Sequence, residues 1–277
     1  MGSGDRQHYL PAALIGGFGD RRGRRDPREA LVCWRRRSSP VVRETIAEAI
    51  GWRRGTYRLE DPQPGVDPDI VDAVWDDVEG ELSSAVGRFE TRADTQADHD
   101  WLRAYAGTAG VRHPQFASAV NRWLPTLDLP PVSGDQVHVA RLVALRNSRE
   151  IIRSWRWRLL HSPQDAPRFA ISDLGWAYIG QPDMNGRGLY LPLNSRVAAL
   201  AWRGTPGGFD HQLLRPNWVR WLNAAMWTEA PEFLVTHPDE HPSLEVQRTA
   251  DEVAARVTLS RGAFQELGGP RLLFDET

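Results

Sequence analysis

The sequence contains no lysine, and all 34 of its basic residues are arginines. Without a lysine amine the chain cannot form a Schiff base with a carbonyl substrate or with pyridoxal phosphate, and it has no Walker lysine for nucleotide phosphates. A basic composition made of arginine alone is typical of a GC-rich bacterial genome. The absence of lysine therefore excludes pyridoxal-phosphate enzymes and P-loop nucleotide hydrolases.

Cysteine and long apolar runs are also scarce. The single cysteine, Cys33, permits no intrachain disulfide and no cysteine-based metal cluster. It lies in an apolar strand pattern, so we expect a buried thiol rather than a nucleophile. No run approaches the ~18 apolar residues of a membrane span, and no signal pattern is visible. We therefore expect a cytoplasmic protein without a membrane partner.

Charge is abundant and unevenly distributed. The net charge of -2 is the near-cancellation of 34 basic and 36 acidic residues in a chain of 277. Arginines concentrate in segments 1–60 and 136–168, whereas acids concentrate in 61–135. We expect a dipolar surface on which the two basic segments share a face, with no overall attraction to nucleic acid or membrane.

Apolar periodicity predicts helices in the middle of the chain and strands on both sides. Helices are predicted over 41–50, 67–89, 95–109, 114–124, 135–161, 217–228 and 244–257. Strands are predicted over 30–34, 168–172, 189–193, 197–202, 232–236 and 272–274. We expect an α+β fold with a mixed or antiparallel sheet and a mostly helical middle. The chain, 1–277, would form a single domain with a helical region of about 67–161 inserted between strand-bearing segments 1–60 and 168–277.

Five short motifs occur in a recognisable order. They are Gln7-His8-Tyr9-Leu10-Pro11 with Phe18, Arg112-His113-Pro114, Phe169-Ala170-Ile171-Ser172-Asp173, Leu191-Pro192-Leu193, and Asn223. In this order and spacing they resemble the bacterial domain-of-unknown-function family numbered 4238. The resemblance implies a shared fold over nearly the whole chain and no established activity. That family usually continues Ser-Asp-Asn-Pro, whereas Leu174-Gly175-Trp176 follows here, so we expect a differently shaped loop.

Asp173 is the leading catalytic candidate, with Ser172 beside it, because it follows a predicted buried strand. A carboxylate there can bind a divalent metal or act as a base. His8 would be its acid–base partner if the N-terminal strand joins the sheet of residues 168–202. The structural alternative is that Asp173 caps a turn, Ser172 bonds to local backbone, and His8 donates to a buried carbonyl.

Arg153 and Arg156, together with Arg149, follow helical spacing and alternate with tryptophans. Such a stripe can hold phosphates and stack bases, and its structural alternative is the solvated face of an amphipathic helix. Gln7 and Asn223, from the first and last motifs of the resemblance, are further substrate-binding candidates.

The remaining histidines give weaker signals. His237 and His241 flank two acids in a metal-like pattern, but neighbouring prolines break any helix there and favour a solvated loop. His99 and His138 are isolated in the sequence, and we expect them at the surface or in caps.

These candidates predict an enzyme acting on a phosphate-bearing small molecule or nucleic acid, as a metal-assisted hydrolase or nuclease. Asp173 would bind the metal, His8 would act as acid or base, and Arg153 and Arg156 would bind phosphate. One alternative is a non-catalytic module that binds a nucleotide or a partner protein. Another is a metal-independent small-molecule enzyme with a pocket lined by some of the 12 tryptophans. Nothing in the sequence indicates the oligomeric state.

Overall fold

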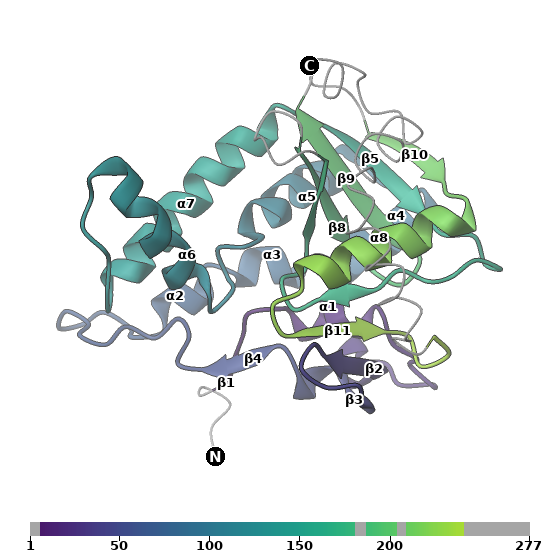
Figure 1. The fold of residues 1–277 in the computed structure, drawn as a ribbon, viewed down its shortest axis with the longest axis horizontal. Coiled ribbons are helices and arrows are strands. Elements are labelled where there is room, and N and C mark those ends of the chain that lie inside the picture. Colours follow the sequence, from purple (N-terminus) through teal and green to yellow (C-terminus); the bar gives the residue numbers. More distant parts are fainter. Residues whose placement is uncertain (1–5, 181–186, 204–208, 241–277) are drawn as a thin grey trace.

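The computed structural model describes residues 6–180, 187–203 and 209–240 (Figure 1). Helices alternate with antiparallel and mixed sheets, which confirms the α+β class. Among the described residues the strands form separate sheets of two, four and five strands. The single mixed sheet expected from the sequence is therefore wrong.

The five-stranded sheet has the order β10-β5-β9-β8-β7. Its strands are β5 (Trp155–His161), β7 (Ala177–Gly180), β8 (Arg187–Pro192), β9 (Val197–Arg203) and β10 (Phe209–Leu213). β10 runs parallel to β5, and all other neighbours are antiparallel. This parallel pair is the feature that positions the candidate site described below.

The C-terminal part of the helix expected over 135–161 is a strand. Helix α7 ends at Arg153, and β5 begins at Trp155. Trp157, Leu159 and His161 are buried on one face of β5, at the two-residue period of a strand. Aromatic residues fit a half-buried sheet well, and here this preference overrides the helical spacing of the arginines.

The four-stranded sheet joins the two ends of the described chain. Its order is β3-β2-β11-β6. β1 and β4 form a separate two-stranded sheet. The strands are β1 (Arg6–His8), β2 (Leu31–Arg36), β3 (Val42–Ile46), β4 (Trp52–Arg54), β6 (Ile171–Ser172) and β11 (Phe233–Thr236). The helix expected over 41–50 is wrong, because β-branched residues favour β3. The strand expected over 30–34, β2, lies in one sheet with β6 from the 168–202 region, as expected. β1, which carries His8, pairs with β4 instead, so His8 is not brought into that sheet.

The helices occupy the middle of the chain and one late segment. They are α1 (Ala12–Gly16), α2 (Ile70–Ala73), α3 (Asp76–Gly80), α4 (Leu82–Thr91), α5 (Gln96–Thr108), α6 (Phe116–Trp123), α7 (Gln136–Arg153) and α8 (Pro216–Glu229), with 3₁₀ helices η2 (Pro27–Glu29), η3 (Ala47–Ala49) and η4 (Leu124–Leu127). The long helix expected over 67–89 is divided into α2, α3 and α4, and Gly80, a poor helix former, lies at one break. No helix in these described ranges combines the length and apolarity needed to cross a bilayer. The elements expected over 244–257 and 272–274 lie outside the described residues.

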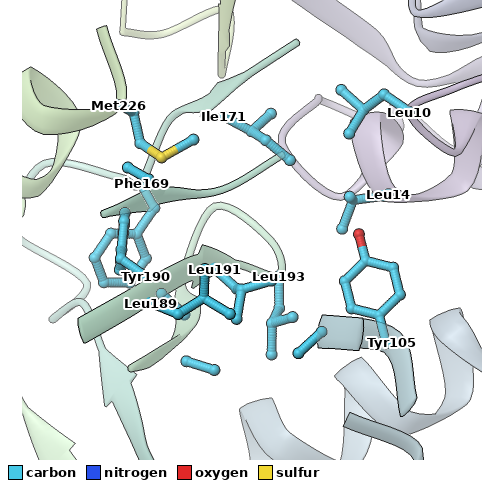
Figure 2. Packing of buried hydrophobic residues seen from close by; sticks show 14 of the residues in the cluster. Leu10, Leu14, Tyr105, Phe169, Ile171, Leu189, Tyr190, Leu191, Leu193 and Met226 are labelled. Atoms are coloured by element: carbon cyan, nitrogen blue, oxygen red, sulfur yellow. The ribbon is translucent and has the colours of Figure 1, made fainter. Parts of the chain in front are cut away.

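The core lies where the two larger sheets meet α1 and α8. Figure 2 shows Leu14 of α1, Leu191 of β8 and Met226 of α8 around the buried side chain of Ile171. α8 packs against β6, β7 and β11, while α4 contacts β9. The thiol of Cys33 is fully buried, and this burial raises its pKa, as expected for a structural cysteine.

Candidate acid–base site

Asp173 lies directly after β6 and is only 1% exposed. Its carboxylate accepts hydrogen bonds from the backbone N–H groups of Glu232 and Phe233, each at 3.2 Å. The Nε2 of His113 lies 3.2 Å from Oδ2 of the same carboxylate. Because the Nδ1 of His113 accepts from the N–H of Gln115, the ring proton is on Nε2 and is donated to Asp173. Asp173 therefore anchors the start of β11, a structural contact with a distant segment rather than the local turn cap of the structural alternative.

The structure pairs Asp173 with His113 rather than with His8. His8 Nε2 contacts the carbonyl of Glu48 at 3.3 Å, and burial lowers the pKa of His8. Tyr9, the next residue, packs edge-on against the His113 ring at a centroid distance of 5.2 Å. Burial, reinforced by the charge of Asp173, raises the pKa of Tyr9 well above its usual value. The cavity beside Tyr9 and His113 measures about 20 Å³, which holds roughly one water molecule and no substrate.

Three other candidates are buried and make structural contacts or lie in the core. The Gln7 amide accepts from the N–H of Tyr57 at 2.7 Å and donates to Asp69 at 3.2 Å. Asn223 on α8 donates to the carbonyl of Arg168 and accepts from the N–H of Ala170, both at 2.8 Å. Ser172 is fully buried, and its hydroxyl has no partner among the described residues.

Arg153 and Arg156 are both exposed but do not form the expected helical stripe. Arg153 is the last residue of α7, whereas Arg156 lies on β5. The guanidinium of Arg156 lies 6.0 Å from the ring centre of Trp202. The two cations therefore lie on different elements, and their helical spacing in the sequence does not describe a shared face.

A second group of titratable residues joins Asp94 to three histidines. One oxygen of Asp94 lies 2.6 Å from Nε2 of His99, and the other lies 2.9 Å from Nε2 of His211. The Nδ1 of His211 lies 2.8 Å from Nε2 of His161. The group thus forms a continuous chain, with Asp94 between two imidazoles. His99, which the sequence placed at the surface or in a cap, is bonded and largely covered instead.

The position of Asp94 is fixed by the corner between α4 and α5. Arg92 ends α4 in the left-handed conformation, at φ 57°. Thr95 caps α5 and forms a capping box with Asp98. Arg88 of α4 binds Asp98 through several hydrogen bonds, which lower the pKa of Asp98 to about 2. These contacts at both ends hold the loop that carries Asp94.

The parallel pairing of β10 with β5 brings His211 to His161. His211 is opposite Leu159, and His161 lies two residues further along β5. Residues two apart in a strand point to the same face, so the two imidazoles are diagonal neighbours. Their ring centroids are 5.1 Å apart. Sequence reasoning missed this contact because β5 was interpreted as a helix and β10 was not predicted.

Burial keeps His161, at one end of the hydrogen-bonded group around Asp94, in its neutral form. Desolvation, reinforced by His211 and Arg92, lowers the pKa of His161 to about 4. Arg92 lies two residues before Asp94, at the end of α4. Its side chain is exposed and makes no hydrogen bond or ion pair with the described part of the chain. The ring of His99 stacks on Phe209 at a centroid distance of 4.0 Å and an interplanar angle of 8°, which fixes its orientation.

No set of three or more histidine, cysteine, aspartate or glutamate side chains in the described ranges is arranged to hold a metal ion. His237 contacts Arg168 and Asp239 in the expected loop, and His241 lies outside those ranges. His138, expected at the surface or in a cap, is buried.

Neither a family model, nor a curated protein, nor a solved structure matches this chain. The family resemblance therefore stays a prediction.

Proposed function

We propose that the protein is a hydrolase that acts on a phosphate-bearing substrate by acid–base catalysis between imidazoles. The observation that carries this proposal is the bridging contact of Asp94, which binds His99 with one oxygen and His211 with the other. A carboxylate that accepts from an imidazole fixes the tautomer and stabilises the imidazolium form. A single carboxylate here orients both the acid, His99, and the imidazole of His211 that is bonded to the base, His161.

The histidines on the two sides of Asp94 have different roles in this scheme. His161, which burial keeps neutral, takes a proton from the attacking water, and the charge passes to His211 beside Asp94. His99, whose Nε2 is held by Asp94, donates a proton from Nδ1 to the leaving oxygen. Water and a phosphate ester thereby become an alcohol and a phosphate. General acid–base catalysis of this kind contributes ~10²–10⁴-fold to a rate.

Arg92 supports the choice of a phosphate-bearing substrate. Arg92 is two residues from Asp94, and its exposed guanidinium makes no hydrogen bond or ion pair within the described residues, so it can form charge-assisted hydrogen bonds to phosphate oxygens. The Asp173 scheme is less well supported, because the carboxylate of Asp173 is buried and already accepts three protein N–H groups.

Hydrolysis of p-nitrophenyl phosphate, bis(p-nitrophenyl) phosphate and p-nitrophenyl acetate tests the proposal. We expect the two phosphate esters to be preferred and Asp94→Asn to lower kcat by ~10²-fold or more. The matched control is Asp100→Asn, because Asp100 is on α5 and its side chain is 64% exposed. Arg92→Gln should raise KM for the phosphate esters alone.

Two outcomes would overturn this scheme. An Asp94→Asn variant that is folded and as active as the wild type would remove its catalytic centre. Activity that is abolished by a chelator and restored by a divalent metal would favour the metal-assisted hydrolase instead.

A further inference from the structure

A pocket of about 260 Å³ lies between α5, α7 and the five-stranded sheet. Figure 1 shows the C-terminal end of α7 meeting the sheet where β5 begins. The pocket is lined by Ala106, Ala109, Ser148, Ile151, Ile152, Trp155, Trp176, Tyr178, Leu189 and Arg203. None of these residues belongs to the Asp94 chain, so the pocket is separate from the proposed hydrolase site.

Aromatic rings dominate the walls of this pocket. Trp176 and Tyr178 pack edge to face, with their centroids 4.6 Å apart and their planes at 73°. Trp155 at the start of β5 adds a third ring, and Ile151 and Ile152 of α7 add aliphatic surface. Such rings prefer to stack with, or pack edge-on against, another aromatic ring. The walls therefore match a flat, unsaturated ligand better than a polyhydroxylated one.

The volume limits the ligand to one or two rings. An apolar cavity of about 150 Å³ accommodates benzene in another protein. The present pocket, at about 260 Å³, has room for a fused bicyclic ring or for one ring with a short substituent. Drug-sized ligands generally occupy pockets of roughly 300–1,000 Å³, so a larger ligand would extend into solvent.

The polar lining specifies the charge of the substituent. Arg203, at the end of β9, is the charged residue among the described residues that line the pocket, and Ser148 of α7 supplies a hydroxyl. An arginine has five N–H donors in a planar fork that matches a carboxylate, so it can bind a ligand while keeping other contacts. An anionic ligand is therefore favoured over a cationic one.

We propose that this pocket binds a planar aromatic molecule of one or two rings that carries a carboxylate or a similar anionic group. The rings of Trp155, Trp176 and Tyr178 hold the aromatic part, and Arg203 pairs with the anion. This assignment does not depend on the proposed hydrolase activity, because the two sites share no residue.

Calorimetric titration of the full chain with three indole probes tests the assignment. Indole-3-acetate carries the anion, indole is neutral, and tryptamine is cationic. We expect indole-3-acetate to bind most tightly and Arg203→Gln to reduce its advantage over indole by about tenfold. Ser148→Trp should fill the pocket and weaken indole-3-acetate binding by at least ~10-fold.

Asn147→Trp is the matched control, because Asn147 is next to Ser148 on α7 but is exposed and does not line the pocket. If Ser148→Trp fails to fold, Ile151→Trp provides a second filled pocket from a residue that is 49% exposed. Three results would overturn the proposal: no binding of any probe at millimolar concentration, undiminished binding to the folded filled variant, or equal binding of tryptamine and indole-3-acetate.

Discussion

Asp173 and Asp94 are both carboxylates with imidazole neighbours, but their surroundings assign them different roles. Asp173 accepts the backbone N–H groups of Glu232, just before β11, and of Phe233, the first residue of β11, in addition to His113, and it is 1% exposed. Asp94 accepts from two imidazoles, one of which stacks on Phe209 and the other of which continues to His161. The first arrangement fixes a strand, whereas the second can move a proton.

Replacing Asp173 with asparagine should destabilise the fold without changing the chemistry at Asp94. The asparagine NH₂ group replaces one of the accepting oxygens, so at least one of the donors from Glu232, Phe233 or His113 loses its acceptor. Because such groups are buried, we expect the free energy of unfolding to fall by about 2–4 kcal/mol, measured by urea denaturation. Asp77→Asn, at an exposed position of α3, should change it by less than ~0.5 kcal/mol.

Hydrolysis rates per folded molecule separate the two roles of these carboxylates. Asp173→Asn should retain the wild-type kcat under conditions where it is folded. A folded Asp173→Asn protein whose kcat falls as far as that of Asp94→Asn would contradict the structural role assigned to Asp173.

Single residues were predictable where the signal was local. Cys33 in an apolar strand pattern is buried, as expected. The carbonyl that His8 contacts belongs to exposed Glu48, 40 residues away, rather than to the buried carbonyl that the structural alternative expected. The partner of Asp173 was not predictable, because His113 is 60 residues away in the sequence. The Asp94 chain depends on the pairing of two strands, and no spacing of its histidines indicates that pairing.

At the level of elements, residues 149–161 carry two overlapping patterns. Arg149, Arg153 and Arg156 repeat at helical spacing, while Trp155, Trp157 and Leu159 repeat every second residue. The helical pattern holds as far as Arg153, and the strand pattern holds from Trp155. Burial decides between them, since Trp157 and Leu159 reach the core only from a strand. The capped helix α5 was predictable because its signals lie within its own residues.

The attachment of α8 to the chain before β6 depends on Asn223. Its side chain satisfies the carbonyl of Arg168 and the N–H of Ala170, both at 2.8 Å. Asn223→Ala leaves these two groups without partners in a place where water has little access. We therefore expect the free energy of unfolding to fall by about 2–4 kcal/mol, measured by urea denaturation.

Asn217→Ala on the same helix is the control for this prediction. Asn217 is exposed and accepts a hydrogen bond from Arg220 at 3.2 Å, so its loss should cost less than ~0.5 kcal/mol. Equal effects of the two substitutions would show that Asn223 does not attach α8 to this segment.

On the scale of the whole molecule, β11 connects the first and last described segments. It pairs antiparallel with β2 on one side and with β6 on the other. Arg37, just after β2, donates to the carbonyls of Trp227, Thr228 and Ala230 at the end of α8. A cation at this end also complements the helix dipole. Contacts over such long sequence separations carry no local signal, so the sequence predicted β2, β6 and β11 as strands but not that β11 lies between the other two.

Because β11 is central, a core defect in it should loosen strands that are far apart in the sequence. Leu234 is fully buried, and its neighbours in the sheet are Arg35 of β2 and Ser172 of β6. Leu234→Ala should lower the free energy of unfolding by about 2–5 kcal/mol, because it leaves a cavity in the core. Native-state hydrogen exchange should then accelerate in β2 and β6 together.

The control for Leu234→Ala is Leu213→Ala on β10, a strand position that is 60% exposed. This substitution should leave both the stability and the exchange of β2 and β6 within error of the wild type, because little apolar area is lost from the core. Faster exchange limited to β11, with β2 and β6 still protected, would mean that β2 and β6 are stable without their pairing to β11. Cooperative loss of protection in all three strands is expected instead, because neither β2 nor β6 has another partner on the side that β11 occupies.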